Sequence, residues 1–100
     1  MYYDMIRFSV MYPRLEGARF DHDYYSTHHV PLAQRAWGVD HADIDRGISG
    51  PFVAAAHFTF ESASELRAAL ATPASAELTA DRSNYTAIEP VVQTSEIVRS

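Results

Sequence analysis

The sequence contains no cysteine and no lysine, and each absence removes a class of function. Without cysteine there is no disulfide, no thiolate nucleophile and no thiolate metal ligand, which fits a cytoplasmic protein. All eight basic residues are arginines, they are scattered along the chain, and the formal net charge is -5 at pH 7. Because no basic stripe is available to contact phosphates, we expect no nucleic acid partner.

Long apolar runs are also missing. No stretch approaches the ~20 apolar residues of a membrane span, and no apolar signal run precedes Asp4, so we expect no membrane association. The sequence has no glycine-rich phosphate loop and no G-x-S-x-G elbow, which argues against nucleotide binding and serine hydrolase chemistry. A length of 100 residues with a hydrophobic fraction of 47% is typical of a single globular domain, residues 1–100.

Two tyrosines, two adjacent histidines and a proline share one helical pattern between residues 21 and 38. Asp21 is an expected N-cap and Gly38 an expected helix end. At about 100° per residue, the inward face would hold Tyr25, His29, Leu32 and Ala36. Pro31 has no N–H to donate to Thr27, so the helix should kink or loosen near the histidines.

Alternating patterns predict strands on either side of this helix and at the end of the chain. The four expected strands are residues 1–12, 39–48, 52–61 and 88–98. A second helical region begins at the capping box Ser62–Glu65, restarts at Thr72–Pro73 and continues to about Ala80. The small alanines at 54 to 56 allow either a cavity or close helix packing beside the third strand.

The order strand, helix, strand, strand, helix, strand predicts a ferredoxin-like α+β fold with a four-stranded antiparallel sheet. Both helices would cover one face of that sheet and leave the other face bare. That face would carry Met5, Met11, Val91 or Ile97, depending on which residues of each strand point to it, and these apolar side chains would need a partner surface. Two such sheets packed face to face would form a dimeric α+β barrel, so we expect a homodimer.

Several separated motifs resemble the EthD family, a branch of the dimeric α+β barrel proteins. The resemblance covers nearly the whole chain and rests on the segments at 10–13, 19–21, 24–25, 29–32, 57–60, 84–90 and 95–96. It implies a dimer with a pocket between sheet and helices. Family members are associated with ethyl tert-butyl ether degradation, and relatives on the fold act as cyclases, decarboxylases, isomerases and cofactor-free oxygenases. The chain departs from the family pattern at Ala87, where an acidic residue is expected, and in having two adjacent histidines.

Three residues are candidates for catalysis. His29 would act as a general acid or base at the inner end of the pocket, because imidazole changes charge near neutral pH. His57 would join it if its strand face looks toward the helices, and would be a buried hydrogen-bonding group if that face looks toward the dimer interior. The Tyr85 hydroxyl would hold a substrate oxygen, with stabilisation of a turn as the structural alternative.

The expected substrate-binding residues are Tyr25, His28, Leu32 and Glu89. No metal is expected, since His28 and His29 point about 100° apart on a helix and no H-E-x-x-H motif occurs. The resulting hypothesis is a catabolic enzyme or accessory protein that binds a hydrophobic compound, uses histidine acid–base chemistry and needs no cofactor. The alternatives are a non-catalytic binding module of the same fold and a haem binder with one axial histidine.

Overall fold

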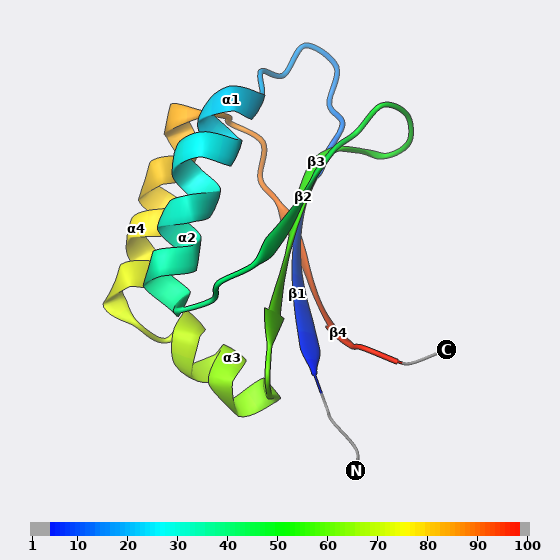
Figure 1. Cartoon of the computed structure of the whole chain (residues 1–100). Coiled ribbons are helices and arrows are strands. Elements are labelled where there is room, and N and C mark those ends of the chain that lie inside the picture. Colours follow the sequence, from blue (N-terminus) through cyan, green and yellow to red (C-terminus); the bar gives the residue numbers. More distant parts are fainter. Residues whose placement is uncertain (1–4, 99–100) are drawn as a thin grey trace.

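The computed structural model describes residues 5–98, in which helices pack against one face of a four-stranded antiparallel sheet (Figure 1). The elements in chain order are β1 (Ile6–Pro13), α1 (His22–Tyr24), the π-helical turn η1 (Tyr25–His29), α2 (Val30–Trp37), β2 (Ala42–Arg46), β3 (Phe52–Phe60), α3 (Ala63–Leu70), α4 (Pro73–Asp81), the 3-10 turn η2 (Arg82–Asn84) and β4 (Val91–Glu96). The strand order β2-β3-β1-β4 confirms the predicted ferredoxin-like fold.

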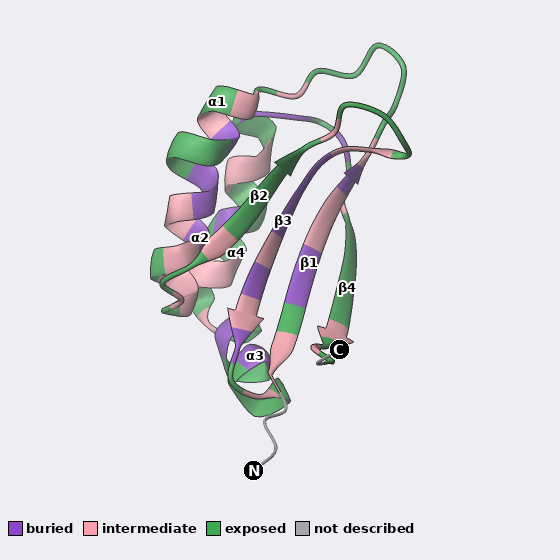
Figure 2. Ribbon diagram, turned by 45° about the vertical axis from the view of Figure 1, so that its right-hand side comes forward, coloured by how far each residue is buried: buried purple, intermediate pink, exposed green. Residues whose placement is uncertain are grey.

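The register of the central strands decides which side chains face the helices. Phe8 pairs with Phe58, and both are buried beneath the helices, whereas the next pair, Ser9 and His57, points to the bare face. Buried residues therefore follow β1 and β3, while β2 and β4 are largely exposed edge strands (Figure 2). In the strand order β2-β3-β1-β4, β1 is a central strand and β2 is an edge strand.

The second and last strands, Ala42–Arg46 and Val91–Glu96, are shorter at both ends than the predicted 39–48 and 88–98, and each late start has a local cause. The second strand begins at Ala42 because the Val39 amide donates to the Gln34 carbonyl and so belongs to the helix exit. The last strand begins at Val91, directly after Pro90, which has no amide hydrogen for a sheet ladder. The part of the first strand predicted for residues 1–4 lies outside the described residues. Within residues 5–98, no helix is long and apolar enough to cross a membrane.

The first helical region has the predicted caps and a local change of pitch. Asp21 accepts a hydrogen bond from the Tyr24 amide, and Gly38 ends the helix with a φ of 68°. Between these ends the Val30 amide donates to the Tyr25 carbonyl five residues back, which is a π-type bond. The expected loosening near Pro31 is therefore confirmed.

The π turn also corrects the predicted inward face. It inserts one extra residue into the helical repeat, so the residues after it are rotated relative to a regular α-helix. The side chains that line the inner surface are His29, Ala33 and Trp37. Leu32 and Ala36, predicted for that position, are only partly buried and do not line the pocket described below.

Candidate functional site

A pocket of about 290 Å³ lies between β1 and the helices α2 and α4. Its wall is mainly aromatic and aliphatic, as in most small-molecule sites, and its size is near the lower end of their range. The lining residues are Phe8, Val10, Tyr12, Tyr25, His29, Ala33, Trp37, Phe58, Leu70, Ser75, Leu78, Thr79, Arg82, Tyr85 and Pro90. The alanines of β3 are absent from this wall, because Ala54 and Ala56 are closely packed in the core.

His29 ends the π turn and brings its imidazole to the wall of this pocket. The ring stacks on Tyr25 with ring centroids 5.6 Å apart and lies 4.6 Å from the ring of Tyr85. Its Nδ1 lies 2.9 Å from Asp81 Oδ2. No residue between 5 and 98 hydrogen-bonds to Nε2. Every fully buried polar side-chain atom in this range has a partner, so Nε2 is not fully buried, and His29 lines the pocket.

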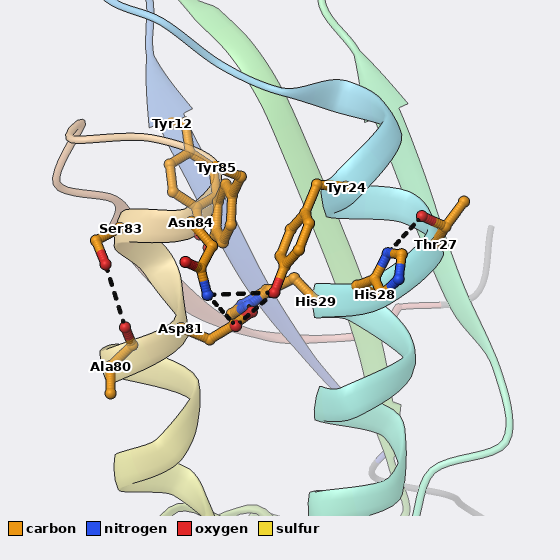
Figure 3. Close-up of polar contacts among 10 residues, drawn as sticks. All are labelled: Tyr12, Tyr24, Thr27, His28, His29, Ala80, Asp81, Ser83, Asn84 and Tyr85. Atoms are coloured by element: carbon orange, nitrogen blue, oxygen red, sulfur yellow. Dashed lines mark hydrogen bonds and ion pairs between the residues drawn. The ribbon is translucent and has the colours of Figure 1, made fainter.

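Asp81, the last residue of α4, connects His29 to two further side chains, those of Tyr24 and Asn84 (Figure 3). Its Oδ1 accepts hydrogen bonds from the Tyr24 hydroxyl at 2.7 Å and from Asn84 Nδ2 at 2.9 Å, while Oδ2 faces His29. An ionised carboxylate only accepts hydrogen bonds, so Nδ1 of His29 carries the proton. The Nε2 lone pair is thereby left for a ligand.

The charge states follow from burial and these bonds. Burial lowers the pKa of His29, and the hydrogen bond to Asp81 offsets part of that shift. Burial by itself would raise the pKa of Asp81, but the hydrogen bonds from His29, Tyr24 and Asn84 together hold that pKa below its usual value. At neutral pH the pair is a neutral imidazole and a carboxylate, which is the arrangement a general base needs.

Two tyrosine hydroxyls meet deeper in the pocket. Tyr12 and Tyr85 share a hydrogen bond of 2.6 Å between their oxygens, and both rings are almost completely buried. Burial raises the pKa of each hydroxyl, so both stay protonated. One hydroxyl donates to the other, so one O–H of the pair is not used in this bond.

Three of the predicted site residues thus meet at one pocket, namely His29, Tyr25 and Tyr85. Three others do not reach it. His28 is exposed, bonds to Thr27 through Nδ1 and stacks on the outer side of Tyr24 (Figure 3). Glu89 is exposed on the segment before β4. Leu32 packs against the core but does not line the pocket.

The predicted convergence of His57 with His29 is wrong, because alternation along β3 directs His57 to the bare face of the sheet. There Ser9 Oγ lies 2.7 Å from Nδ1 and Asp45 Oδ2 lies 3.0 Å from Nε2, so both ring nitrogens are occupied. This Ser–His–Asp order resembles that of a serine hydrolase, but Ser9 lies in a central strand whose neighbours on both sides are paired. Such a strand has no free amides to form an oxyanion hole.

Sequence reasoning did not single out Asp81, Arg82 or Trp37. Asp81 and Arg82 fell at the edge of a polar turn, and no spacing rule indicates which carboxylate a buried histidine will contact. Trp37 was assigned no role, although its Nε1 donates to Ser75 Oγ and holds the indole on the pocket wall. Among residues 5–98, no three histidine, aspartate or glutamate side chains are grouped as metal ligands.

Comparison with known proteins gives matches among solved structures. Neither a family model nor a curated protein matches the sequence. An EthD-like protein from Ralstonia eutropha JMP134 is 39% identical, with a TM-score of 0.89 over 98% of this chain and 96% of the other.

Two further matches share the fold at lower identity. A dimeric ferredoxin-like protein of unknown function from Thermobifida fusca is 11% identical, with a TM-score of 0.65 over 97% of this chain and 96% of the other. SnoaB, a cofactor-independent oxygenase from Streptomyces nogalater, is 10% identical, with a TM-score of 0.66 over 95% and 96%.

Proposed function

Because the chain belongs to the EthD-like family, we propose that it binds a small apolar ring compound between sheet and helices and moves a proton on it with His29. No cofactor takes part in this reaction. The observation that carries the proposal is the orientation of one imidazole, with Nδ1 held by Asp81 and Nε2 open to an apolar pocket. The cofactor-independent oxygenase on the same fold is consistent with chemistry of this kind.

The proposed step is a proton transfer within the pocket. The Nε2 lone pair of His29 takes a proton from a carbon next to a carbonyl, and the electron pair of the broken C–H bond moves onto the carbonyl oxygen. The Asp81 carboxylate stabilises the imidazolium that forms. Return of the proton to the same carbon gives exchange, and return to a neighbouring atom gives an isomer, so no further reactant is needed.

The test uses β-tetralone, an enolisable bicyclic ketone, in D2O. Binding is followed by the fluorescence of Trp37, the single tryptophan of the chain, and exchange of the protons next to the carbonyl is followed by NMR. We expect His29→Asn to keep a donor to Asp81 but to slow the catalysed exchange by about 100-fold or more, since general bases contribute about 10²–10⁴. His28→Asn is the matched control, because its imidazole lies outside the pocket.

The same experiment separates the proposal from a binding module. Binding without accelerated exchange in the wild type would indicate a protein that holds hydrophobic ligands and does not turn them over. Equal exchange rates in the wild type and in a folded His29→Asn variant would remove His29 from the mechanism.

We also propose that the protein is a homodimer in which the bare sheet faces pack together. The face away from the helices carries Met11 and Val91, and Val91 is 48% exposed in the single chain. A protein of similar fold that is described as dimeric supports a dimer. Analytical ultracentrifugation at micromolar concentration should give twice the chain mass, and a single-chain mass would contradict the dimer.

A further inference from the structure

We propose that Arg82 binds an anionic oxygen of the ligand, so that the natural substrates are apolar ring compounds carrying a carboxylate or a carbonyl that becomes an enolate. This inference rests on the function proposed above and adds the substrate class. It begins from a cation at the wall of a mainly apolar pocket. Arg82 is the only arginine among the lining residues, and it is partly buried there.

The guanidinium of Arg82 has no protein partner between residues 5 and 98. No hydrogen bond or ion pair from its side chain occurs in that range, although a guanidinium carries five N–H donors. Arg14, by contrast, donates to the carbonyls of Gly47, Gly50 and Phe52. The acid nearest in sequence, Asp81, is already occupied by His29, Tyr24 and Asn84.

The position of Arg82 at the end of α4 would by itself favour a positive charge, because the carboxyl end of a helix carries the negative end of the helix dipole. That effect does not require the side chain to line a pocket. The guanidinium charge also reaches inward: burial raises the pKa of the Tyr12 and Tyr85 hydroxyls, and Arg82 offsets part of that rise. An oxygen placed between Arg82 and the tyrosine pair would therefore meet a cation on one side and an O–H donor on the other.

The chemistry of His29 calls for such a partner. When Nε2 removes a proton from carbon, one negative charge is left on the ligand oxygen, and an apolar pocket cannot stabilise it without a donor or a cation. Arg82 supplies a fixed positive charge that a carboxylate or enolate can contact through two N–H groups.

The pocket volume limits the size of the apolar part. An apolar cavity of about 150 Å³ holds benzene. The present pocket of about 290 Å³ therefore has room for a substituted ring or two fused rings. The substrate class is then a mono- or bicyclic acid, or an enolisable ketone of the same size.

The test compares an indane carboxylate with the corresponding carboxamide, which has the same shape without the charge. Trp37 fluorescence should show that the wild type binds the carboxylate at least about tenfold more tightly than the carboxamide. Arg82→Met should weaken carboxylate binding by about tenfold to 100-fold and leave carboxamide binding unchanged. Arg82→Lys should keep part of the preference, and Arg35→Met, an exposed arginine on α2, should keep all of it.

A second arm distinguishes a permanent carboxylate from an enolate formed during reaction. If Arg82→Met also slows the exchange of β-tetralone protons while the affinity for β-tetralone is unchanged, Arg82 stabilises the enolate formed during the reaction. If only the affinity for the carboxylate falls, Arg82 binds an anionic group that is already present on the substrate.

Two results would overturn the inference and are distinguishable. Equal binding of carboxylate and carboxamide, with Arg82→Met unchanged in binding and exchange, would exclude Arg82 but leave the pocket function intact. Binding of none of the three probes by the wild type would overturn the proposed function together with this inference.

Discussion

The replacement Asp81→Asn tests whether the carboxylate behind His29 determines which ring nitrogen faces the pocket. In the wild type the carboxylate can only accept, so the proton is on Nδ1 and the Nε2 lone pair is free. An asparagine amide can instead donate to Nδ1, which would place the imidazole proton on Nε2. The variant would then keep its fold, but the Nε2 lone pair of His29 would no longer be available to accept a proton.

The expected stability change is modest because the network is only rewired. Asp81 takes part in three hydrogen bonds of 2.7 to 2.9 Å. Charge-assisted bonds contribute roughly 1 kcal/mol more than neutral ones, so removing the charge should cost about 1–3 kcal/mol. For a chain of this length that is a fall in Tm of about 5–15 °C at equal protein concentration. The pKa of His29 should also fall further, because Asp81 is the group that opposes the effect of burial.

The assay is the ¹⁵N shift of the two ring nitrogens of His29 at neutral pH. We expect a protonated Nδ1 and an unprotonated Nε2 in the wild type, the reverse in Asp81→Asn, and no change in Asp40→Asn, where the acid is exposed. Catalysed exchange should fall by about 100-fold or more in Asp81→Asn with ligand binding retained. A wild-type His29 that is protonated on Nε2 at pH 7, alone or on both nitrogens, would refute the reasoning.

Three further predictions follow from the same contacts. Tyr12→Phe leaves the buried Tyr85 hydroxyl without its partner, so urea unfolding should show a loss of about 1–3 kcal/mol, and the double Phe variant should cost less than the sum of the single changes. Burial lowers the pKa of His29 below the unfolded value of 6.5, so the unfolded chain binds the proton first; stability should fall as pH drops below about 6.5, and His29→Asn should reduce that slope. Ala33→Phe should fill the pocket, and Trp37 fluorescence should then stop responding to ligand in a protein that still unfolds cooperatively; retained binding would place the ligand elsewhere.

Local patterns predicted the elements and their order well, because each rests on a few neighbouring residues. The Asp21 cap, the Gly38 helix end and the Ser62 cap depend on backbone groups within three or four positions. Alternation likewise identified β1 as a strand. The predicted strand starts were less accurate, because the Val39 amide bonds to the preceding helix and Pro90 has no amide hydrogen, so neither residue joins the sheet.

The candidate site was predicted in part, and the errors have specific causes. Leu32 was assigned to the pocket because a regular helical repeat was continued through the π turn, whereas one extra residue puts Ala33 and Trp37 there instead. Asp81 was missed because it lies 52 residues from His29 and meets it only through tertiary packing of α4 on α2. Periodicity contains no information about such a contact.

His57 in the sheet and His29 in the helix layer show that a histidine can act as a base only where one ring nitrogen is free to take a proton. His57 has Ser9 on one nitrogen and Asp45 on the other, so accepting or giving a proton there would break a hydrogen bond that the sheet already uses. His29 has one nitrogen fixed by Asp81 and one directed into a cavity. The cost of binding a ligand at His29 is therefore only the removal of solvent, since no protein hydrogen bond must be exchanged. Of the two candidates that the sequence offered, geometry favours the one whose second nitrogen has no partner among residues 5–98.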